Sequence, residues 1–154
     1  MILTEHLGHD GRGLPTEKST LNENHQRHGL CQFFTHGRLS MEITYEHGLR
    51  HGITTLYHGN GKIHSTMTYV KDYLEGERKS FDEHGVLTLL ETYRNGQLHG
   101  PYKSYHPNGE LHQEGTFEDH LKSGVWETYD RNKKLLTSEH FDKGIRMHHG
   151  DEDD

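Results

Sequence analysis

Large apolar residues recur along this chain with a period of about 24 residues. Each period opens with a glycine, an aromatic residue follows five positions later, and a turn, a large aliphatic residue and a second aromatic residue complete the unit. The unit glycines are Gly29, Gly52, Gly76, Gly100 and Gly124. The first aromatics are Phe34, Tyr57, Phe81, Tyr105 and Tyr129, and the second aromatics are Tyr45, Tyr69, Tyr93, Phe117 and Phe141.

The turn inside each unit predicts a β-hairpin with a defined register. In the second unit, a three-residue loop at 59–61 pairs His58 with Lys62 and Tyr57 with Ile63. A glycine at the last loop position suits the left-handed residue that closes such a turn. The first unit is one residue shorter, yet a two-residue loop still pairs Phe34 with Leu39.

Lys133 stands where the other four units have a glycine at the end of the turn. Because a side chain disfavours the left-handed region, we expect the last turn to be strained or rearranged.

Alternation along the strands predicts that one face carries both aromatics and the aliphatic of each hairpin. For the second unit this face is expected to hold Ile53, Thr55, Tyr57, Ile63, Ser65, Met67 and Tyr69. The other face is expected to hold Thr54, Leu56, His64, Thr66 and Thr68. The predicted fold is all-β, a single-layer twisted antiparallel meander of repeated β-hairpins with about ten to eleven strands and little or no helix.

Three segments follow from the repeat. Residues 1–24 are predicted to form an N-terminal segment, in which 12–24 resemble a degenerate half repeat. Residues 25–147 are predicted to form the five-unit hairpin domain. Residues 148–154 form an acidic tail that is expected to be disordered. Only 29% of the residues are hydrophobic and the mean hydropathy is −1.04, so order must come from regular placement. Ten of the fourteen aromatic residues occupy the two repeated positions, and their burial is expected to stabilise the fold.

Charge, the length of the apolar stretches and the N-terminal sequence limit the expected classes of partner and the expected cellular location. The net charge of −7 comes without a basic patch, so no nucleic acid is expected as a partner. Arg50, Lys71 and Lys122 are interleaved with acids, and no apolar stretch approaches 18 residues, so no membrane partner is expected either. With no segment typical of a signal peptide, a cytoplasmic location is the default expectation.

Catalytic, cofactor and metal sites are not predicted. Cys31, the single cysteine, has no histidine and acid at a spacing that requires a triad, and it cannot form a disulfide or a Cys-rich zinc site. The chain has 17 histidines, but equivalent positions such as His64 and His112 lie in different hairpins and are too far apart to share an ion. The sequence therefore favours a non-enzymatic protein.

Partner binding is the function that the second face favours. It carries Phe33, Leu56, Arg78, Tyr102 and Trp126, each on the first strand of its unit, and exposed aromatic and arginine side chains anchor interfaces. On this interpretation, Trp126→Ala and Arg78→Ala weaken partner capture and leave the melting temperature nearly unchanged. The alternative is that Tyr102 and Trp126 pack against neighbouring side chains. A thin apolar face could also be covered by a second copy of the chain, in a homodimer.

The segments "HGPYKSYHPNGELHQEGTF" and "SGVWETYDRNKKLLTSEHF" resemble the variant MORN repeat, and the resemblance covers residues 25–145. It implies a protein-binding role, and the family resembles YwqK-like bacterial antitoxins or immunity partners. A stoichiometric inhibitor of a toxin or other effector is therefore expected. The alternative is a virus-encoded or structural adaptor or scaffold that sequesters or recruits a host factor.

Overall fold

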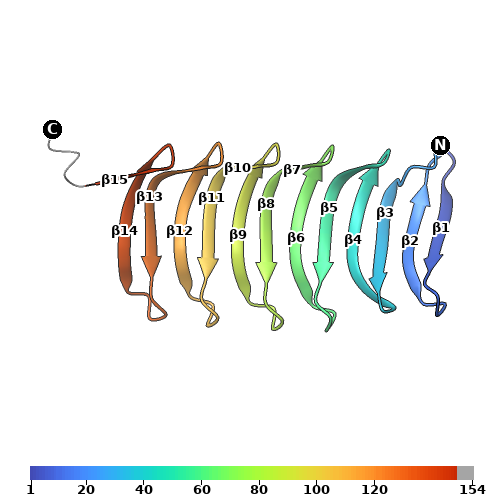
Figure 1. The fold of residues 1–154 in the computed structure, drawn as a ribbon, viewed down its shortest axis with the longest axis horizontal. Coiled ribbons are helices and arrows are strands. Elements are labelled where there is room, and N and C mark those ends of the chain that lie inside the picture. The colour runs from blue at the N-terminus through green and yellow to red at the C-terminus, as the bar shows by residue number, and fades with distance from the viewer. Residues whose placement is uncertain (149–154) are drawn as a thin grey trace. The chain divides into compact units, whose positions relative to one another are not determined.

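The computed structural model describes residues 1–148, and all of its regular elements are antiparallel strands (Figure 1). This confirms the predicted all-β meander of hairpins. The chain divides into two compact units, one made of Met1–Glu75 with Glu83–Gly85 and the other of Gly76–Asp82 with the chain from Val86 on. The acidic tail predicted for 148–154 lies outside the described residues from position 149 onward.

The first unit contains seven strands. They are β1 (Thr4–His9), β2 (Pro15–Leu21), β3 (Gly29–Thr35), β4 (Arg38–Glu46), β5 (Leu49–Tyr57), β6 (Ile63–Val70) and β7 (Tyr73–Leu74). Strands β1 to β6 pair in sequence order, and β7 pairs with β6. Strands β1 and β2 form a full hairpin where the repeat indicated only a half unit at 12–24.

The second unit contains eight strands in its described part. They are β8 (Gly76–Phe81), β9 (Leu87–Arg94), β10 (Gln97–Leu98), β11 (Gly100–Tyr105), β12 (Leu111–Glu118), β13 (Leu121–Tyr129), β14 (Leu135–Asp142) and β15 (Ile145–Met147). The pairing order is β8-β9-β11-β12-β13-β14-β15, with β10 on β9. The described chain therefore has more strands than the ten to eleven predicted, because the link segments pair as short strands and the N-terminal segment adds a hairpin.

The predicted hairpin register is confirmed. Tyr57 pairs with Ile63 and Phe34 with Leu39, and the His58 amide donates to the Lys62 carbonyl at 2.8 Å. Lys133 adopts the left-handed conformation with φ 69°, so the fifth turn keeps the shape that glycine allows elsewhere and places a lysine in an unfavourable region.

The expected common face for both aromatics of a hairpin is wrong, because each hairpin contains a β-bulge. In β5 and β6, Leu56 pairs with Ser65 but Tyr57 pairs with Ile63, so His64 is an extra residue. Gly52 and Thr54 pair with Tyr69 and Met67. The second aromatic therefore shares a face with the even-numbered residues of β5, and Tyr57 lies on the opposite face, where its hydroxyl donates to Glu42.

We call the face that bears the second aromatics the inner face and the opposite one the outer face. The buried apolar residues of the described chain are Cys31, Ile43, Met67 and Trp126, and their strand pairings place all four on the inner face. Ile53 and Ile63, which were expected in the core, are 61% and 41% exposed. The same register shift beside the first aromatic recurs in the other four repeat units, so the correction applies to each of them.

Candidate protein-binding face

Phe33 and Leu56 lie in one row on the inner face of the first unit. Phe33 pairs with Met41 across β3 and β4, and Met41 pairs with Leu56 across β4 and β5. All three side chains are half-buried, so the row combines contact with its neighbours and contact with solvent. The structure thus brings together two of the five residues predicted to bind a partner.

Arg78, in the second unit, is already engaged within the protein. It pairs with Glu91 across β8 and β9, and its Nη1 donates to Glu91 Oε1 at 3.2 Å. The other carboxylate oxygen of Glu91 accepts a hydrogen bond from the Tyr93 hydroxyl at 3.2 Å. Arg78 therefore neutralises a nearly buried carboxylate, a structural role that exists whether or not it also contacts a partner.

Trp126 is only 3% exposed, which contradicts the premise that it is an exposed aromatic anchor. Its ring centroid lies 5.3 Å from that of Tyr102 and 5.0 Å from that of Phe117, and its indole Nε1 donates to the Thr116 carbonyl at 3.1 Å. Tyr102 and Trp126 thus pack against each other and their neighbours. The binding of a partner by Phe33, Leu56, Arg78, Tyr102 and Trp126 stays a prediction.

An arginine–aromatic band lies on the inner face of the first unit and was not found from the sequence. It consists of Arg27, Phe33, Tyr45, Arg50 and Tyr69. The Arg27 guanidinium lies 5.3 Å from the Phe33 ring centroid and 5.8 Å from that of Tyr45. Such cation–π contacts are strengthened where the groups lose part of their hydration.

Two carboxylates hold the arginines of the band in place. Arg27 makes a two-point contact with Glu17, with Nε and Nη2 donating at 2.7 and 2.9 Å. Arg50 Nε donates to Asp72 Oδ1 at 2.7 Å, and its guanidinium lies 4.1 Å from the Tyr69 ring centroid.

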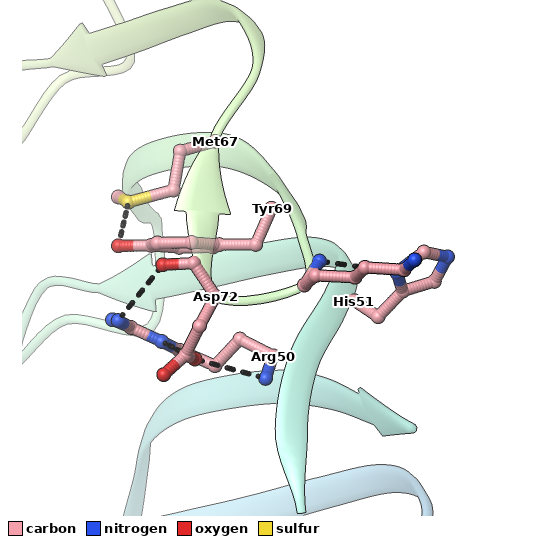
Figure 2. A network of polar contacts seen from close by, with 6 residues as sticks. Arg50, His51, Met67, Tyr69 and Asp72 are labelled. Atoms are coloured by element: carbon pink, nitrogen blue, oxygen red, sulfur yellow. Dashed lines mark hydrogen bonds and ion pairs between the residues drawn. The ribbon is translucent and has the colours of Figure 1, made fainter. Parts of the chain in front are cut away.

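Figure 2 shows Tyr69 beside Arg50 and Asp72, with the Tyr69 hydroxyl directed at the Met67 sulfur, to which it donates at 3.6 Å. The turn after β6 is tied to the same cluster, because the Asp72 amide donates to the Arg50 carbonyl at 2.8 Å and the Lys71 amide donates to His51 Nδ1 at 3.3 Å.

A sequence pattern could have identified the band. Arg27, Arg50 and Lys122 each stand two positions before a unit glycine, so they fall outside a unit that is counted from that glycine. Lys122 behaves like the arginines, since its Nζ lies 4.5 Å from the Trp126 ring and 5.0 Å from the Phe141 ring. A cation at this position is therefore a marker for stacking on the second aromatic.

The Arg27–Glu17 pair makes stability depend on pH. The Arg27 guanidinium, hydrogen-bonded to the carboxylate, holds the pKa of Glu17 below its ordinary value of 4.5 despite partial burial, and the Ser19 hydroxyl adds to the effect. Because folding lowers this pKa, the pair stabilises the fold above about pH 4.5, and the contribution is lost as the pH falls through the lower pKa of the folded state.

We therefore expect Glu17→Gln to lower the free energy of unfolding by about 1–2 kcal/mol near pH 6 and by much less near pH 2. Melting temperatures measured across this range would show the wild type and the variant converging. Glu5→Gln is the matched control, because Glu5 is 60% exposed and lies 4.0 Å from Lys18. A constant difference between Glu17→Gln and the wild type at all pH values would contradict the assignment.

Other chemistry in the described residues is limited. No group of three or more His, Cys, Asp or Glu side chains within 1–148 is placed to hold a metal ion. Cys31 is fully buried, and its thiol lies 3.7 Å from the Gly29 carbonyl. Within the same residues no helix could cross a bilayer.

Comparisons with known proteins identify the repeat. The family model for the MORN repeat variant matches residues 50–71, 74–95, 98–119 and 122–143, which together make up more than half of the chain. No curated protein matches the sequence. Among solved structures, the crystal structure of the GtfA/B complex bound to UDP and GlcNAc is similar with a TM-score of 0.33 and 11% identity, over 71% of this chain and 22% of that chain. A likeness at this level supports no conclusion about function.

Proposed function

Because the chain belongs to the MORN repeat variant family, we propose that it works by binding a partner protein stoichiometrically, as an antitoxin-like or immunity-like inhibitor. Repeats of this family generally form binding modules for proteins or membranes. The proposed partner is a toxin or another effector protein that docks on the inner face of the first unit.

The observation that carries this proposal is the arginine–aromatic band. Arginine and tyrosine are the residue types that most often dominate binding energy at interfaces. The side chains of Arg27 and Arg50 are 40% and 37% exposed, so part of each remains accessible to another protein. Since Glu17 and Asp72 already fix the two guanidinium groups, a partner would order few additional rotamers on binding.

The test is affinity capture from the native cell, followed by reconstitution with the purified partner. Arg50→Ala removes a cation–π contact and an exposed ion pair, so we expect it to weaken the purified complex at least about tenfold with little change in melting temperature. Arg146→Ala is the matched control, because Arg146 makes a comparable exposed pair with Glu139 at 3.5 Å outside the band. Equal affinities for Arg50→Ala and the wild type would contradict docking at the band.

The activity of the purified partner separates the two functional classes. Loss of its activity at equimolar amounts of this protein supports the inhibitor, and a stable complex with undiminished activity supports the adaptor or scaffold. If this protein sediments with anionic lipid vesicles and forms no complex with a protein, both the inhibitor and the adaptor or scaffold are contradicted.

A further inference from the structure

Two hairpins, one in each unit, place a pair of histidines side by side at the same position of the repeat. The rings of His58 and His64 have centroids 4.7 Å apart, and those of His106 and His112 have centroids 4.5 Å apart. The first histidine of each pair follows the first aromatic residue, and the second is the extra residue of the bulge. Such pairs lie within one hairpin, whereas histidines in different hairpins, such as His64 and His112, are too far apart to share an ion.

The same two positions, the residue after the first aromatic and the extra residue of the bulge, also bring side chains together in a hairpin without histidines there. In the first repeat, Thr35 and Ser40 occupy equivalent places, and their hydroxyl groups lie 3.2 Å apart. The bulge therefore directs the two side chains toward each other as a property of the backbone.

Turn formation does not require a histidine here. In the hairpins with an aspartate at the first position, that residue caps the turn, as where the Val86 amide donates to Asp82 Oδ1 at 2.9 Å. In the histidine hairpins an asparagine of the loop takes over, with Asn60 accepting from the Lys62 amide and Asn108 from the Glu110 amide. In these hairpins the turn amide is therefore capped by the asparagine and not by the histidine.

A backbone carbonyl holds one ring nitrogen of His106. Its Nε2–H donates to the Tyr129 carbonyl at 2.8 Å, which leaves the lone pair on Nδ1. A backbone carbonyl holding the second ring nitrogen is the usual support of a coordinating histidine. Two imidazoles bound to one ion at adjacent positions have centroids about 5 Å apart, which the observed separations approach.

A third histidine pair shows the contrast. The centroids of His28 and His47 are 4.8 Å apart, but His28 Nδ1 accepts from the His47 amide at 3.1 Å, and Asn22 Nδ2 lies 3.3 Å from His47 Nδ1. Both Nδ1 atoms therefore take part in hydrogen bonds within the protein. In the proposed pairs, His64 Nδ1 also lies 3.0 Å from Ser65 Oγ, so Nε2 is the nitrogen that His64 offers to an ion.

We propose that the His58–His64 and His106–His112 pairs are two equivalent sites for a divalent transition metal ion of the Ni²⁺, Cu²⁺ or Zn²⁺ type. Imidazole suits these ions. Each pair provides two ligands, and water completes the coordination because His64 and His112 are exposed.

Calorimetric titration of the untagged full chain with Ni²⁺ at about pH 7.5, where imidazole is neutral, tests the proposal. His64→Thr and His112→Thr copy the residue at the same place in the third repeat, Thr88, so the fold is retained. We expect each variant to lose one of two tight equivalents, and the double variant to bind the remaining ions at least about tenfold more weakly. His47→Asn, the matched control, should bind like the wild type.

Unchanged stoichiometry and affinity in the double variant would overturn the proposal, and so would an equal loss in His47→Asn. A second measurement uses the wild type alone: substoichiometric Cu²⁺ should broaden the imidazole NMR signals of the two proposed pairs first. Earlier broadening at other histidines would also overturn it.

Discussion

Replacing Trp126 with alanine is expected to lower the free energy of unfolding by about 3–5 kcal/mol. The indole is the largest buried side chain of the inner face in the second unit, and it contacts Tyr102, Phe117 and Phe141. Its removal would leave these rings facing a cavity that a strand pair cannot close, and it would also release the Thr116 carbonyl.

Urea unfolding followed by circular dichroism measures this effect without relying on tryptophan fluorescence. Tyr73→Ala is the control, because Tyr73 is 60% exposed in the short strand β7, and we expect a change of less than about 0.5 kcal/mol. A melting temperature near that of the wild type for Trp126→Ala would instead restore the interpretation drawn from the sequence, in which this residue serves a partner.

Gly115→Ala is expected to destabilise the same cluster by about 1–3 kcal/mol although it adds only a methyl group. A Cβ atom at position 115 would lie 2.1 Å from Cδ2 and 2.3 Å from Cε2 of Trp126, so the indole would have to move. Unfolding in urea gives the cost, and a red shift of tryptophan emission would report the displaced ring.

Two comparisons isolate the clash between position 115 and the indole. Gly59→Ala meets no atom within 4 Å and should leave stability nearly unchanged. In a chain that already carries Trp126→Ala, the further change Gly115→Ala should cost far less, because the ring is absent. Equal costs of Gly115→Ala in both backgrounds would show that the effect does not come from the indole.

The sequence predicted the hairpin register because loop length and turn glycines determine which residues face each other. The pairs Tyr57–Ile63 and Phe34–Leu39 follow from that rule alone. The faces could not be predicted in the same way, because the bulge adds one residue and so reverses the alternation. The extra residues are chemically unlike one another, so no residue type marks the bulge: Ser40, His64, Thr88, His112 and Leu136.

The error in the faces explains the error about Trp126. With both aromatics assigned to one side, Trp126 fell on the opposite side and was taken as exposed, whereas the observed pairing places it with Phe117 and Phe141. The arginine–aromatic band was missed for another reason. Arg50 precedes its unit glycine, and its stacking on Tyr69 depends on the turn that carries Asp72, some twenty residues further along the chain.

The bulge in each hairpin also affects how such an array can change in length. Since every repeat directs its first aromatic to the outer face and its second aromatic to the inner face, adding or deleting a whole repeat changes both sides of the sheet together. A repeat without the bulge would direct both of its rings to one side and leave the backbone on the other side open to water. Duplication of complete hairpins therefore preserves the balance between the two surfaces, and gain or loss of a single bulge residue does not.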